Sequence, residues 1–151
     1  MTINPFDLKS ALLAKHAQHV VLVHFPIALF ISSVLFDLLA IRKGSRSLTK
    51  AAYYNLIGAA ITALAAVITG VLAWQLQLEG QRLRGNLRLH LVLGTSAAIL
   101  IWTLAWWRAR QNRTDNSSLT AGYWALVFIA VLVVALTGHL GGILSGVEVP
   151  N

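Results

Sequence analysis

The sequence predicts an all-α integral membrane protein: an up-down-up-down bundle of four transmembrane helices with a short N-terminal interfacial helix. Hydrophobic residues make up 57% of the 151 residues and charged residues only 11%, which is not the composition of a soluble domain. Long apolar stretches occur at about 20–41, 51–74, 89–107 and 119–144. Each is near or above the roughly 20 residues that a helix needs to cross the hydrocarbon core. We therefore expect 1–151 to form a single membrane domain.

The segment before the first apolar stretch predicts the interfacial helix. Asn4 followed by Pro5 is a helix-start signal, and the next turns have a partly apolar face. The residues of that face are Phe6, Leu8, Leu12 and Leu13. The segment is too long and too acidic for the leader of a short signal peptide, so we expect the first apolar stretch to be a retained span.

The connections define two faces of the bundle. Arg42–Lys50 and Arg108–Ser118 are polar and predict exposed turns at one end, and Gln75–Arg88 predicts a longer loop at the other. The first end carries seven basic residues and the second five. By the positive-inside rule, the second end and both termini lie outside the cytoplasm. Basic residues beside the bilayer indicate contact with membrane lipids.

All five histidines fall at that second end, which makes it the candidate site. His24 lies just inside the first span, His90 opens the third, and His139 lies about a turn and a half before the end of the fourth. Ionisable groups at membrane depth indicate function. The first and third spans of such a bundle are usually diagonal, so we expect His24 and His90 to be axial ligands of haem b. His16 and His19 precede the span, where solvation competes with binding a divalent ion.

Other residues near these histidines are candidates for holding the cofactor. Gly138 and Gly142 have the spacing that lets a ring or another helix approach the backbone closely, and helix packing alone explains them equally well. Arg82, Arg84 and Arg88 precede His90 and would pair with haem propionates or a quinone head group. Lipid phosphates are the alternative partner for these arginines.

At the opposite end, Asp37 is the only acidic residue inside a span, and Asn55 lies at comparable depth. We expect the two side chains to bond each other across adjacent helices. No chain of polar residues connects this pair to the histidines, so a structural role is favoured over a proton path.

Composition narrows the function further. The chain has no cysteine, which excludes thiolate ligands and covalent haem attachment. No catalytic triad, phosphate loop or carboxylate pair occurs, and nothing supports nucleic-acid binding. The favoured function is electron transfer between a quinone or other membrane donor and a partner protein, as a component rather than a stand-alone enzyme. The alternatives are a non-catalytic subunit or scaffold, and a copper or zinc site without haem.

Two segments resemble a known family. Residues 19–29 read HVVLVHFPIAL and are followed by Asp37, and residues 138–149 read GHLGGILSGVEV. Both are similar to segments of a bacterial four-helix membrane family, domain of unknown function 2231 (DUF2231). Some members are joined to redox domains, so the resemblance implies electron transfer in the bacterial cytoplasmic membrane. Members have His-Pro where this chain has His19 and Val20, and a Tyr near the position of Ser145, so a role is implied for His24 more than for His19.

Overall fold

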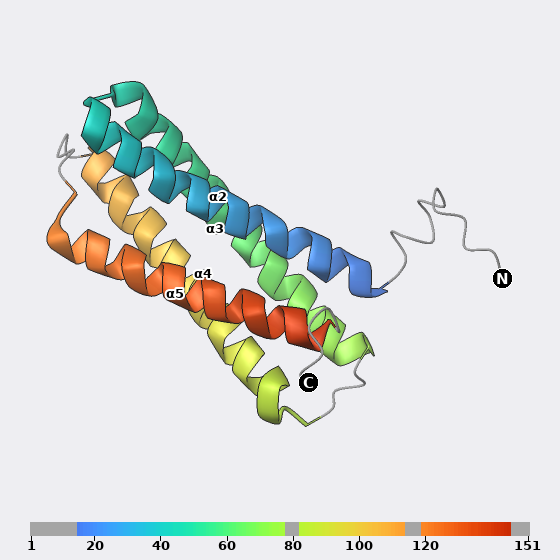
Figure 1. The fold of residues 1–151 in the computed structure, drawn as a ribbon. Coiled ribbons are helices and arrows are strands. Elements are labelled where there is room, and N and C mark those ends of the chain that lie inside the picture. Colours follow the sequence, from blue (N-terminus) through green and yellow to red (C-terminus); the bar gives the residue numbers. More distant parts are fainter. Residues whose placement is uncertain (1–14, 78–81, 114–118, 146–151) are drawn as a thin grey trace.

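Four long helices form the part of the chain that the structure, a computed structural model, describes: residues 15–77, 82–113 and 119–145. They are α2 (Lys15–Lys43), α3 (Arg46–Gln77), α4 (Gly85–Arg113) and α5 (Ala121–Leu144). Consecutive helices run antiparallel (Figure 1). Each contains a segment long and apolar enough to cross a membrane. The all-α four-helix fold is thus confirmed, and the expected interfacial helix lies outside the described residues.

The helix ends have local causes in the sequence. Gly44 adopts a φ of 60° between α2 and α3, a conformation that costs glycine nothing. Thr120 caps α5, because its side chain accepts a hydrogen bond from the backbone N–H of Tyr123. The predicted turn at 108–118 is partly wrong: α4 continues to Arg113, because Arg108 has a buried partner described below.

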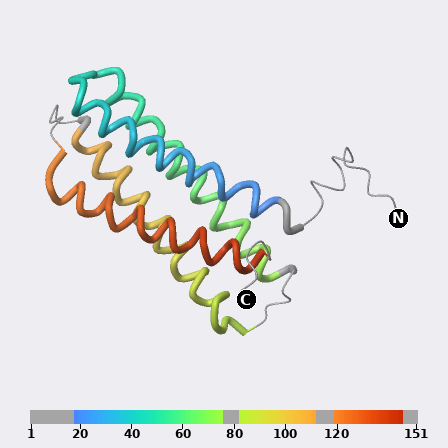
Figure 2. Tube along the Cα trace, in the orientation of Figure 1, coloured from blue at the N-terminus to red at the C-terminus, as the bar shows by residue number. Residues whose placement is uncertain are grey.

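The bundle consists of two helical hairpins. Helix α2 packs mainly against α3, and α4 packs against α5 and α3, so α2 and α4 lie diagonally. The ends of α2 and α4 meet the beginnings of α3 and α5 at one end of the molecule (Figure 2). We call this the turn end and the opposite one the histidine end.

Buried residues follow one stripe along each helix. In α2 the buried positions are Pro26, Phe30, Ser33, Asp37 and Ala40. Their spacing alternates between four and three residues, which is the seam of helices packed at a small crossing angle. The stripes of the other helices have the same spacing. They contain Ala52, Leu56, Ala59 and Ala63 in α3, Ala97, Ile101, Leu104 and Arg108 in α4, and Tyr123, Val127, Ala130 and Val134 in α5.

The buried core occupies only part of the bundle. Almost all of the buried residues lie between the turn end and the middle of the helices. The four segments near the histidine end, 18–25, 64–75, 82–96 and 135–145, contain no buried residue. We call these segments the histidine half. Their inner side chains are half-buried, so the helices there do not close around a packed core.

Candidate functional site

The inner stripes place two histidines inside the histidine half. Stepping back from Pro26 by seven residues along α2 reaches His19, and stepping back from Ala97 by seven residues along α4 reaches His90. Both side chains are half-buried. The two side chains belong to α2 and α4, the diagonal helices of the bundle. We call His19 and His90 the histidine pair.

His90 packs against α5. Its Nδ1 lies 3.2 Å from the carbonyl oxygen of Thr137. The ring also lies over Gly141: a Cβ added to that glycine would lie 3.3 Å from the Cε1 of His90, which is tighter than ordinary van der Waals contact. Gly141 therefore leaves room for the ring against the backbone of the neighbouring helix.

His19 packs against α3 in the same way. Its Nδ1 lies 3.2 Å from the hydroxyl oxygen of Thr69. A Cβ added to Gly70 would lie 2.9 Å from the Cε1 of His19, a distance that requires the ring to move. Each hairpin thus repeats one arrangement, in which a histidine on its first helix meets a threonine and a glycine on its second.

Two histidines alone form this group. No cluster of three or more histidine, aspartate or glutamate side chains that would hold a metal ion is found within residues 15–77, 82–113 and 119–145. Zinc sites in proteins use three or four protein ligands. A haem iron needs only two, because the macrocycle supplies the other four. Two imidazoles are a donor set that suits haem iron.

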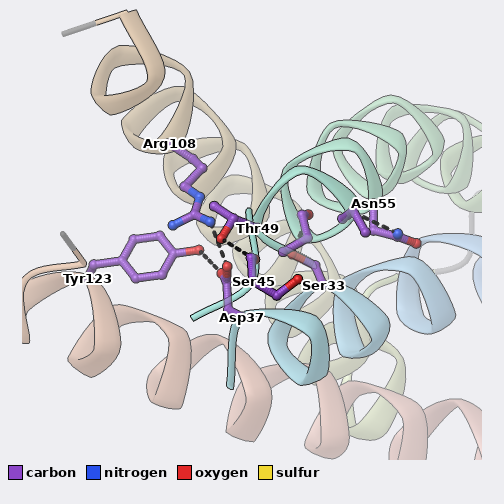
Figure 3. Close-up of polar contacts among 9 residues, drawn as sticks. Ser33, Asp37, Ser45, Thr49, Asn55, Arg108 and Tyr123 are labelled. Atoms are coloured by element: carbon purple, nitrogen blue, oxygen red, sulfur yellow. Dashed lines mark hydrogen bonds and ion pairs between the residues drawn. The ribbon is translucent and has the colours of Figure 1, made fainter. Parts of the chain in front are cut away.

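A second polar cluster lies at the turn end, within the buried core (Figure 3). Arg108 of α4 donates from Nη2 to Oδ1 of Asp37 of α2 at 2.6 Å. Tyr123 of α5 donates from its hydroxyl to Oδ2 of the same carboxylate at 3.3 Å, and the Arg108 guanidinium lies 5.7 Å from the Tyr123 ring centroid. Asp37 is 3% exposed and Arg108 5%. The cluster joins three helices.

Comparison with known proteins decides the family. Residues 15–148 match the family described as predicted membrane protein (DUF2231). The chain belongs to this family. No curated protein and no solved structure matches it. As a DUF2231 protein it is a multi-pass membrane protein whose helices contact lipid.

His24 and His90, the predicted axial ligands, differ in exposure in this DUF2231 chain. His90 is half-buried, as described, but His24 is exposed, and its Nδ1 donates to the carbonyl of Val20 in its own helix at 2.6 Å. His139 is exposed as well. The structure therefore places His19, rather than His24, on the inner side of α2. The side chain of His16 lies outside those described.

The other predicted site residues lie around the histidine end. Gly138 is exposed, and an added Cβ would meet nothing within 4 Å, whereas Gly142 is half-buried. Arg82, Arg84 and Arg88 are exposed. Arg88 also lines a hollow of about 390 Å³ together with Gly85, Leu89 and Val92.

The expected bond between Asp37 and Asn55 is wrong. Asn55 donates to the carbonyl of Ala51 in its own helix at 2.8 Å. The Asp37 carboxylate accepts hydrogen bonds from Arg108 and Tyr123 instead. Arg108 was assigned to a turn because it follows the apolar stretch. Its depth was the available signal: Asp37 and Arg108 both lie near the ends of helices that finish on the same side of the membrane.

Proposed function

We propose that this DUF2231 protein is a membrane electron-transfer protein of the b-type cytochrome kind, which binds haem b through His90 of α4 and a histidine of α2. One observation carries the proposal: His19 and His90 are half-buried on the inner stripes of two diagonal helices, in the half of the bundle without buried residues. Flat cofactors in helical bundles are held in this way, by side chains of facing helices.

The residues around the pair fit the role. Gly70 and Gly141 let the two rings pack directly against the neighbouring helices, and the absence of cysteine leaves imidazole as the strong ligand available to iron. When bound, haem supplies a one-electron redox couple. The chain's own part is to hold two imidazoles in place and to keep the site within an apolar bundle, which tunes the potential of such centres.

The arginines at the histidine end complete the proposal. Arg82, Arg84 and Arg88 are exposed in the segment that leads to His90, and guanidinium groups bind carboxylates through paired hydrogen bonds. In this proposal they would pair with haem propionates, with lipid phosphates or with a quinone head group. A quinone or a redox partner protein would exchange electrons at this end, which the loop charges assign to the external side of the membrane.

The visible spectrum of the purified protein tests the proposal. We expect a Soret band and sharp reduced bands typical of two imidazole ligands. His90→Ala and His19→Ala should each abolish haem retention, because a buried macrocycle would keep only one protein ligand. His24→Ala and His139→Ala should leave the spectrum unchanged, since both side chains are exposed.

The same series separates the other assignments. Loss of haem in His24→Ala but not in His19→Ala would move the α2 ligand to His24. Absence of haem from wild-type protein produced with haem available would rule out a b-type cytochrome. Copper or zinc bound through the pair would then appear in elemental analysis, and a scaffold protein would contain neither haem nor metal.

A further inference from the structure

The hydrogen bonds of His19 determine which ring nitrogen carries the proton. The hydroxyl of Thr69 donates its one hydrogen to carbonyls of its own helix, Ala65 at 2.9 Å and Ala66 at 3.1 Å. Toward His19 it therefore acts only as an acceptor. His19 thus donates from Nδ1, and its neutral ring keeps the lone pair on Nε2.

His90 reaches the same state by a different route. Its Nδ1 faces the backbone carbonyl of Thr137, and a carbonyl only accepts. The hydroxyl of Thr137 is directed elsewhere, to the carbonyl of Val133 at 2.7 Å. The His90 bond therefore depends on the backbone, whereas the His19 bond depends on a side chain. This difference makes the Thr69 contact accessible to mutation and the Thr137 contact a matched control.

We propose that Thr69 is a positioning residue: its hydroxyl holds His19 as the Nδ1–H tautomer and thereby makes Nε2 the electron-pair donor toward a bound metal. The part that concerns haem iron rests on the proposed function. Hydrogen bonds of this kind orient ligating imidazoles, and their loss typically lowers metal affinity about 10–100-fold. The hydroxyl of Thr69 is an uncharged acceptor, so we expect a loss near the lower limit, about tenfold.

Nitrogen NMR of the haem-free protein, labelled with ¹⁵N-histidine, tests the tautomer directly. Ring couplings to Hδ2 and Hε1 distinguish Nδ1 from Nε2, and the His19 signals are identified by their loss in His19→Gln. At a pH where the ring is neutral, we expect the proton of His19 on Nδ1. Thr69→Val should move it to Nε2, Thr69→Ser should restore it, and Thr137→Val should leave the His90 tautomer unchanged.

Haem titration of the same variants supplies the second measurement. Thr69→Val should bind haem about tenfold more weakly than wild type, with Thr69→Ser and Thr137→Val close to wild type. A His19 proton on Nε2 in the wild type, or an unaltered tautomer in Thr69→Val, would overturn the inference, as would equal haem affinity in Thr69→Val. A wild type with the expected tautomer that binds no haem would contradict the proposed function. The tautomer change in Thr69→Val would still support the role of Thr69.

Discussion

Two glycines determine how closely each histidine ring approaches the neighbouring helix. Gly70 faces His19 and Gly141 faces His90, and an added Cβ would lie 2.9 Å and 3.3 Å from the respective Cε1 atoms. A methyl group at either position would collide with the histidine ring, because the ring packs directly against the helix backbone. Gly138, which resembles them in the sequence, has open space around it. The role of a glycine here depends on the face of the helix rather than on its neighbours in sequence.

Gly70→Ala should displace His19. We expect a loss of stability of about 1–3 kcal/mol, typical of overpacking, together with reduced haem retention if the proposed function is right. Thermal unfolding in detergent and the Soret absorbance measure the two effects. Gly138→Ala is the control and should be neutral or stabilising by about 0.5–1 kcal/mol, because alanine is the better helix former. Equal behaviour of the two variants would contradict the packing described for Gly70.

At the scale of the helices, the sequence predicts the depth of a residue in the membrane better than the direction in which its side chain faces. Lipid allows only helices and closed β-barrels to cross, and stretches of about 20 apolar residues fit helices, so the apolar stretches of the sequence located all four. The depth of His24 and of His19 was equally readable, but only the stripe through Pro26, Phe30 and Asp37 shows that His19 faces inward. That stripe is difficult to read in a sequence in which lipid-facing positions are as apolar as buried ones.

The contacts between helices, Thr69 with His19 and Asp37 with Arg108, are equally difficult to predict from the sequence. Thr69 follows the usual pattern of a threonine in an apolar helix, bonded to carbonyls of its own helix, and nothing in the sequence marks its second contact with His19. Asp37 and Arg108 are 71 residues apart. Their equal depth makes the pairing readable in retrospect, because a charge inside the membrane requires a partner.

Asp37→Asn should destabilise the bundle markedly. The substitution keeps the shape of the side chain but leaves the Arg108 guanidinium buried without a counter-charge, and breaking such a pair typically costs about 3–5 kcal/mol. Thermal unfolding in detergent measures the loss. The double variant Asp37→Leu with Arg108→Met should recover much of it, because apolar replacement of both partners is often neutral or stabilising. An Asn variant as stable as wild type would show that the ion pair is not needed.

At the scale of the whole molecule, the outward surface is apolar around the bundle. Large exposed side chains such as Ile41, Tyr54, Ile61, Ile99 and Phe128 are 62–68% exposed. Their exposure fits lipid contact over the whole length of the spans, since a soluble protein of this size would rarely expose so much apolar surface. The turn end carries more basic residues than the histidine end, and the positive-inside rule therefore predicts that the turn end faces the cytoplasm.

Cysteine labelling checks that orientation. The chain has no cysteine of its own, so single replacements at Ser47 and Ser117 give clean reporters of the turn end. We expect both to be protected from an impermeant thiol reagent in intact cells and to react after permeabilisation. A cysteine placed at Arg82, at the histidine end, should react in intact cells. The opposite pattern would place the histidine pair on the cytoplasmic side.

The confinement of the buried core to one end has an evolutionary consequence. A fold that is held together by one half of its length leaves the other half free to change its chemistry without refolding. Under the proposed function, substitutions at positions such as His19 or Gly141 would then alter haem binding while the region around Phe30, Leu104 and Tyr123 preserves the scaffold. Relatives with the same four helices are therefore expected to vary more at the histidine end than in the buried core.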